Sequence, residues 1–216
     1  MTRQKADEFA KTLEIILTRA AHTLGSALAN YWPATGNNDC AEANVIVHVA
    51  AALAAAKFAI YSEVALEPRQ RGAGDGAIGH LDLLAHREGR WVALEAKRLY
   101  SAEQAARIAD DWKRLTTHQP TTAHENPPAA PLLRVVLATT WEREDRKTAG
   151  WWRSPTDRHA WADGPGWAAL GACLKEAKCD GAKLQHAAGW GTQWLLWAFG
   201  EVPGAARNGM LRRAPA

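Results

Sequence analysis

The N-terminal part of the chain has apolar positions at helical spacing. Between residues 3 and 31 they recur every three or four positions, with charged residues on the opposite face: Phe9, Leu13, Ile16, Leu17, Ala20, Leu24 and Leu28. This pattern predicts a long amphipathic helix. A second helix is predicted from Asp39 to about Lys57, because Asp39 and Glu42 have the spacing of a capping box. Its apolar stripe is Val45, Ile46, Val49 and Leu53.

The pattern then changes to that of strands. The run "KFAIYSEVAL" (57–66) is rich in β-branched and aromatic residues, and a glycine-rich segment, "RQRGAGDGAIG" (69–79), follows it. "HLDLLAHREGRWVALEAK" (80–97) contains two more apolar runs. Three consecutive strands are therefore predicted.

A helix and a buried strand are predicted next. Ser101 and Gln104 form a second capping-box pattern, which predicts a helix from Ser101 to about Thr117. "PLLRVVLATTW" (131–141) is almost continuously apolar, as is typical of a strand covered on both faces. Beyond it we expect a polar loop over residues 142–161, a helix within 166–178 and a last strand over 192–202.

Composition and charge exclude several classes of protein. The 216 residues are 47% hydrophobic and 23% charged, as in an ordinary globular protein, and the net charge of +3 permits a polyanionic partner without indicating one. Cys40, Cys173 and Cys179 show no paired spacing, so neither a disulfide framework nor a zinc site is expected. The sequence shows no signal peptide and no stretch apolar enough to span a membrane, which favours a cytoplasmic protein without membrane association.

The strand pair at 80–97 carries charges within its apolar runs. With a two-residue turn at Glu88 and Gly89, residues pair where their numbers sum to 177. Asp82 would then face Glu95, with His80 opposite Lys97 on the same face of the sheet. Two carboxylates about 5 Å apart repel each other unless a cation or a proton lies between them. A three-residue turn would instead place Asp82 and Glu95 on opposite faces.

The charged side chains of this hairpin suit a divalent ion. Carboxylate oxygens are the ligands that Mg²⁺ prefers, and Mg²⁺ keeps several waters that substrate phosphate can replace. Lys97 would lie on the same side, where an ammonium can position a metal-adjacent water or offset negative charge in the transition state. The sequence therefore predicts a Mg²⁺ site with Mn²⁺ as a substitute.

A helix acid, a strand acid and an acid-x-lysine motif follow one another in the chain: Glu42, Asp82, and Glu95-Ala96-Lys97. Between residues 39 and 140 this arrangement resembles the PD-(D/E)XK nuclease superfamily, also called restriction-endonuclease-like. By that resemblance Asp82 and Glu95 bind the metal, and the carbonyl of Ala96 adds a ligand. Lys97 would be the catalytic lysine, and Glu42 a further acid near the same ion.

The resemblance implies an α/β fold with a restriction-endonuclease-like αβββαβ core, in which helices flank a central mixed sheet. We expect one nuclease-like domain over residues 1–216, with an extra N-terminal helix (1–36), the catalytic core (37–141), a Trp-rich C-terminal extension (142–202) and a tail (203–216). The sequence departs from the motif at Leu81, which stands in the place of the proline before the first acid.

Several of these residues have a structural alternative. Glu95 and Lys97 could form a solvated surface pair, although the surrounding "VALEAK" is apolar for an exposed strand. Glu42 could serve only as part of the helix cap. Glu63 could line the site from the first strand or face solvent, and His80 could contact a phosphate or metal-bound water or be a structural residue.

Basic and aromatic residues suggest contacts with nucleic acid. Arg69 and Arg71 lie in the glycine-rich segment, and Arg98 follows the catalytic motif. Trp151 and Trp152 stand among basic residues that could hold phosphates while the rings stack on bases: Arg146, Lys147 and Arg153. Because Trp buries a large apolar area, packing in the core is the alternative for both rings.

These features predict a Mg²⁺-dependent nuclease that hydrolyses phosphodiester bonds, with DNA rather than RNA as the substrate by family resemblance. Restriction, repair and toxin enzymes all fit, and a toxin would need an immunity or inhibitor protein as a partner. A duplex cutter could form a homodimer, with the first helix as the interface. The alternatives are a non-catalytic nucleic-acid-binding or scaffold protein that retains the fold, and a purely structural set of ion pairs.

Overall fold

The computed structural model describes residues 3–30, 42–68, 79–120, 132–142, 144–155, 159–184 and 192–202. Its centre is a mixed sheet with the strand order β4-β1-β2-β3-β5-β7-β6. Six strands have 7 to 11 residues and β4 has only three. The strands are β1 (Ala59–Pro68), β2 (His80–Arg87), β3 (Arg90–Arg98), β4 (His118–Pro120), β5 (Leu132–Glu142), β6 (Lys178–Leu184) and β7 (Thr192–Glu201). Within this sheet β3 and β5 are parallel, and the other strand pairs are antiparallel.

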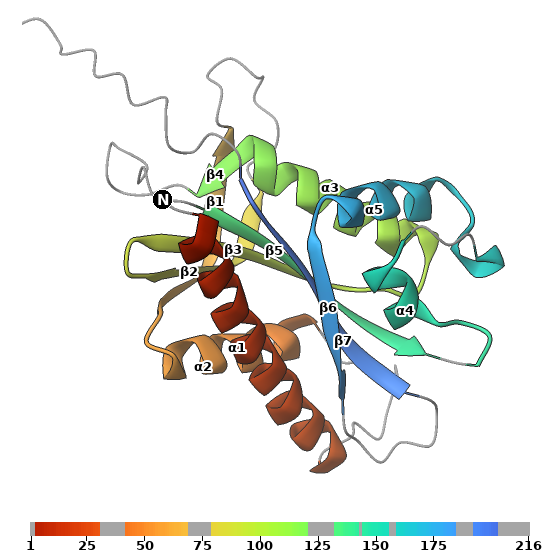
Figure 1. Ribbon diagram of the computed structural model, residues 1–216, viewed down its shortest axis with the longest axis horizontal. Helices are drawn as coiled ribbons and strands as arrows, with labels where there is room; N and C mark the ends of the chain where they lie inside the picture. Colours follow the sequence, from red (N-terminus) through yellow and green to blue (C-terminus); the bar gives the residue numbers. More distant parts are fainter. Residues whose placement is uncertain are drawn as a thin grey trace, which may run out of the picture.

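Helices cover both faces of the sheet (Figure 1). One face carries α1 (Arg3–Asn30) and α2 (Glu42–Ala55), and the other carries α3 (Ala102–Thr117), α4 (Thr148–Arg153) and α5 (Pro165–Lys175). A short 3₁₀ helix, η1 (Ala160–Ala162), precedes α5. Among the helices described, none is both long and apolar enough to cross a membrane.

Two apolar clusters fill the spaces between sheet and helices. Leu17 and Leu53 of the two N-terminal helices belong to the cluster that includes Leu94 of β3. Ile108 of α3 belongs to the cluster on the other face, with Ala93 of β3. Because Ala93 and Leu94 are neighbours on one strand, β3 is covered on both sides, and its charged residues must find partners within the protein.

The predicted order of helix, three strands, helix and strand is confirmed, with β4 inserted between α3 and β5. The capping interaction predicted for α3 is also present. Ser101 Oγ accepts a hydrogen bond from the Gln104 N–H at 3.2 Å, and Gln104 Oε1 accepts one from the Tyr100 N–H at 2.6 Å. The α/β class, the mixed sheet with flanking helices and the extra N-terminal helix are thus present.

The structure differs from the prediction after residue 142. Residues predicted as a loop contain α4, whose Lys147 cap makes no side-chain hydrogen bond, so the usual capping signal is missing. The strand β6 was not predicted, because it is short and polar and contains Gly181, features that are typical of a turn. A side chain at Gly181 would meet the Leu195 carbonyl oxygen at 2.9 Å, so glycine allows the backbones of β6 and β7 to approach.

Candidate active site

The β2–β3 hairpin has the predicted turn and register. Leu83 pairs with Leu94 and Arg87 with Arg90, so the numbers sum to 177 in both cases. The turn residues Glu88 and Gly89 have φ angles of 51° and 73°. Two left-handed residues are what a tight type I′ hairpin turn requires. The two-residue turn on which the site prediction depends is therefore confirmed.

Followed away from the turn, the regular pairing of β2 with β3 ends at Leu83 and does not include Asp82. At this position a side chain, rather than a backbone carbonyl, accepts the hydrogen bond from β3: Asp82 Oδ2 accepts one from the Ala96 N–H at 2.8 Å. On the other side of β2, the pairing with β1 skips Asp82 as well, at Glu63, which has a left-handed φ of 51°. The predicted direct pairs of Asp82 with Glu95 and of His80 with Lys97 are consequently not formed. His80 pairs with Ala65 of β1 and is exposed.

Lys97 is the centre of the charged cluster at this end of the hairpin. Its Nζ lies close to three carboxylates: 3.5 Å from Asp111 Oδ2, 3.6 Å from Glu95 Oε2 and 3.9 Å from Asp82 Oδ2. It also donates a hydrogen bond to the Ala96 carbonyl at 3.0 Å. Asp82 and Glu95 thus do share a cation, as their charges demand, and in this structure the cation is the Lys97 ammonium.

A second cation reaches the cluster from α3. Arg114 Nη2 lies 2.5 Å from Glu95 Oε1 and 2.9 Å from Asp111 Oδ1. Glu95 is only 1% exposed, whereas Asp82 retains 28% exposure of its side chain. Three carboxylates and two cations therefore form one network that joins β2, β3 and α3, and solvent reaches it at Asp82, Lys97 and Arg114.

The surroundings shift the pKa of three members of this network. Burial, followed by repulsion from Asp82 and Asp111, raises the pKa of Glu95 to about 8. Burial also raises the pKa of Asp111, against the opposing effect of Lys97 and Arg114. For Lys97, burial alone would lower the pKa, but attraction from Asp111, Asp82 and Glu95 outweighs it and raises the pKa. The cluster thus favours a charged lysine and can still take up positive charge, as a proton or as a metal ion.

Glu42 lies at the same end of β3, at the first residue of α2. Its Oε1 accepts a hydrogen bond from the Arg98 N–H at 3.2 Å and lies 4.0 Å from Arg98 Nε. The carboxylate also contributes to the raised pKa of Lys97. The structure thus brings Glu42 near the cluster, where it ties α2 to β3. Asp39, the other half of the predicted capping box, lies outside the described residues.

The remaining predicted residues fall into different environments. Glu63 is exposed on β1, and Arg69 and Arg71 lie outside the described residues. Trp151 and Trp152 are 4% and 0% exposed, which supports packing and removes both rings from the proposed nucleic-acid contacts.

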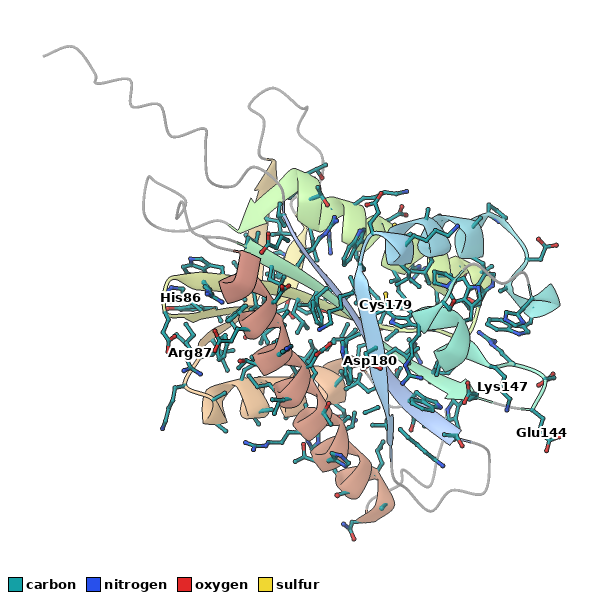
Figure 2. The ribbon with its side chains drawn as sticks, in the orientation of Figure 1. His86, Arg87, Glu144, Lys147, Cys179 and Asp180 are labelled. Atoms are coloured by element: carbon teal, nitrogen blue, oxygen red, sulfur yellow. The ribbon has the colours of Figure 1, made fainter. Side chains whose placement is uncertain are left out.

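The basic residues near these tryptophans are mostly engaged within the protein. Arg146 Nη1 donates a hydrogen bond to the Tyr100 carbonyl at 2.9 Å, and Arg153 Nε lies 2.8 Å from Asp180 Oδ1. Lys147 is exposed, and Figure 2 shows it beside Glu144, on the side of the molecule away from the hairpin turn at Arg87.

Asp111 and Arg114 were not predicted from the sequence. They stand three positions apart on α3, so their side chains lie on the same side of the helix. The sequence gives little indication of their role in the site. Both flank the buried stripe of Ile108, Trp112 and Leu115 and look like ordinary boundary residues of an amphipathic helix. Only the packing of α3 against β3 shows that they meet Glu95 and Lys97.

The donor set of the cluster fits a hard divalent ion in kind but not in its present arrangement. Asp82, Glu95 and the Ala96 carbonyl offer oxygen atoms of the type that Mg²⁺ prefers. However, no group of three or more His, Cys, Asp or Glu residues in the described ranges is arranged to hold a metal ion. Lys97 stands among the donors instead, so a metal could enter only if that ammonium moved. Comparisons with protein-family models, curated proteins and solved structures found no match to this chain.

Proposed function

We propose that this chain is a metal-dependent nuclease with a restriction-endonuclease-like core that hydrolyses phosphodiester bonds. The supporting observation is the convergence of Asp82, Glu95 and Lys97 at one partly exposed end of the β2–β3 hairpin. Three separate features of the chain bring them together there: the tight turn, the buried position of Glu95 and the charged contacts from α3. DNA is proposed as the substrate on the family resemblance alone.

Each residue has a distinct role in this proposal. Asp82 and Glu95 would hold Mg²⁺, with the Ala96 carbonyl as a further ligand. The bound ion supplies a Lewis acid and lowers the pKa of its water toward neutrality. Lys97 would donate a hydrogen bond to the scissile phosphate or orient the attacking water, because its side chain is 24% exposed and remains charged.

Plasmid cleavage tests this proposal. Supercoiled DNA is incubated with the full chain and Mg²⁺ or Mn²⁺, with and without chelator. We expect metal-dependent nicking that falls roughly 100-fold or more in Lys97→Ala and Asp82→Asn. Lys113→Ala and Asp110→Asn are the matched controls, because they remove the same charges from an exposed ion pair on α3 and should keep full activity. Cleavage without metal, or full activity in both site variants, would refute the proposal.

One observation favours a second candidate, a purely structural cluster. All three carboxylates of the network already have a cationic partner, Lys97 or Arg114. In that case calorimetry would detect no binding of Mg²⁺ or Mn²⁺ to the wild-type chain, and Asp82→Asn would only destabilise the fold. A non-catalytic nucleic-acid-binding protein would bind the plasmid without turnover and without a metal requirement.

A further inference from the structure

The Lys97 ammonium contacts Asp111 at least as closely as it contacts the two proposed metal ligands. The Nζ distances are 3.5 Å to Asp111 Oδ2, 3.6 Å to Glu95 Oε2 and 3.9 Å to Asp82 Oδ2. Asp111 does not belong to the hairpin, because it lies on α3. Lys97 therefore has a carboxylate partner that the proposed metal site does not use.

Asp111 is held in place independently of Lys97. Its Oδ1 pairs with Arg114 Nη2 at 2.9 Å, and the same nitrogen lies 2.5 Å from Glu95 Oε1. Arg114 thereby links Asp111 to one proposed ligand while leaving Asp111 Oδ2 directed at the ammonium. The side chain of Asp111 is only 13% exposed, so its attraction for Lys97 is weakly screened by solvent.

A divalent ion and an ammonium cannot both lie between Asp82 and Glu95, because two cations that close together repel strongly in a partly buried site. Metal binding therefore requires a new position for Lys97. The lysine side chain has four flexible methylene groups, and Asp111 is a carboxylate within 3.5 Å of Nζ toward which the ammonium can turn.

We propose that Asp111 is a positioning residue that receives the Lys97 ammonium when a divalent cation occupies Asp82 and Glu95. This inference rests on the proposed function, and it gives the α3 carboxylate a specific role. Without Asp111, Lys97 competes with the metal for the same two acids. With Asp111, the ammonium stays charged and close to the metal site, where the proposed reaction needs it.

A double-mutant cycle on metal affinity separates this role from simple attraction between Asp111 and the metal. Mn²⁺ is titrated by calorimetry into the full-length wild type, Asp111→Asn, Lys97→Met and the double variant. We expect Lys97→Met to bind Mn²⁺ more tightly than the wild type. We expect Asp111→Asn to weaken binding at least tenfold when Lys97 is present, and less than threefold in the Lys97→Met background.

The outcomes distinguish this inference from the proposed function. If the wild type binds no Mn²⁺, both are overturned. If it binds Mn²⁺ and Asp111→Asn has the same effect in both backgrounds, or none, only the role of Asp111 is overturned, as it also is if Lys97→Met weakens binding. Asp110→Asn, whose side chain is 78% exposed, is the control and should stay within twofold of wild type. Circular dichroism checks folding, and Asp111→Ser replaces Asp111→Asn if the latter does not fold.

Discussion

Glu95 Oε1 lies 2.5 Å from Arg114 Nη2, on a side chain that is only 1% exposed. A buried carboxylate at the end of a covered strand is thus anchored from the neighbouring helix in addition to its contact with Lys97 of its own strand. The same arginine binds Asp111, which in turn contacts Lys97. The position of the candidate site consequently depends on how α3 packs against β3.

Removing Arg114 should destabilise the fold strongly. At pH 9, above the Glu95 pKa of about 8 in the folded chain, Arg114→Met leaves the ionised Glu95 buried with only Lys97 nearby, and truncating one partner of a buried pair typically costs about 3–5 kcal/mol. Urea unfolding measures the loss. Arg107→Met is the matched control, because Arg107 pairs on the same helix with the exposed Glu103, and such surface pairs contribute about 1 kcal/mol or less. Equal losses in the two variants would show that the contact with Glu95 is unimportant for stability.

Stability should fall as the pH rises toward 8 in the presence of chelator. Glu95 has a pKa of about 8 in the folded chain, raised from 4.5. Below pH 4.5 it is protonated in both states, and between the two values the folded chain binds more protons than the unfolded chain. The contribution of Glu95 is therefore fully present below pH 4.5 and is lost as the pH rises through 8, with a slope of at most about 1.4 kcal/mol per pH unit.

Urea unfolding at several pH values between 5 and 8 measures this slope. Glu95→Gln should flatten it, because the amide does not titrate. Glu103→Gln removes an exposed carboxylate from α3 and should keep the wild-type slope. A wild-type slope in Glu95→Gln would contradict the assignment to Glu95.

The predictions that succeeded from sequence were local. The register of the hairpin from Leu83 and Leu94 to Arg87 and Arg90 followed from the turn at Glu88 and Gly89, because two-residue turns determine which strand positions pair. Ser101 and Gln104 likewise marked the start of α3 through hydrogen bonds within four residues.

The features that the sequence did not predict depend on contacts between distant segments. Asp82 leaves the regular pairing to bind the Ala96 N–H, and Asp111 and Arg114 become part of the cluster only through packing of α3 on β3. The buried environment of Trp151 and Trp152 also depends on elements that come later in the chain, since Trp152 Nε1 donates a hydrogen bond to the Trp197 carbonyl at 2.9 Å. No periodicity within a short window contains this information.

The hairpin turn can be improved, which tests the geometry that positions Asp82. Glu88 has a φ of 51°, where Asn is favoured in a type I′ turn. Glu88→Asn should stabilise the chain by about 0.5 kcal/mol or more in urea unfolding, even though it removes the ion pair with Arg87, because Glu88 is 75% exposed in that pair. Glu88→Ala removes the same ion pair without the turn preference and should not stabilise. A loss of stability in Glu88→Asn would contradict the turn geometry.

The packing of α3 against α5 should control the site from a distance. A side chain at Gly166 of α5 would collide with the carbonyl oxygen of Ala102 in the first turn of α3. Gly166→Ala must therefore push the two helices apart, which should cost about 1–3 kcal/mol in urea unfolding and shift the helix that carries Asp111 and Arg114. The proposed nuclease activity should fall as well, because a shift of α3 also displaces the contacts that these residues make with Lys97 and Glu95. Gly150→Ala in α4 is the control: a side chain there meets nothing within 4 Å, so the variant should be neutral or up to about 1 kcal/mol more stable. If both variants are neutral, close packing of α5 does not determine the position of α3.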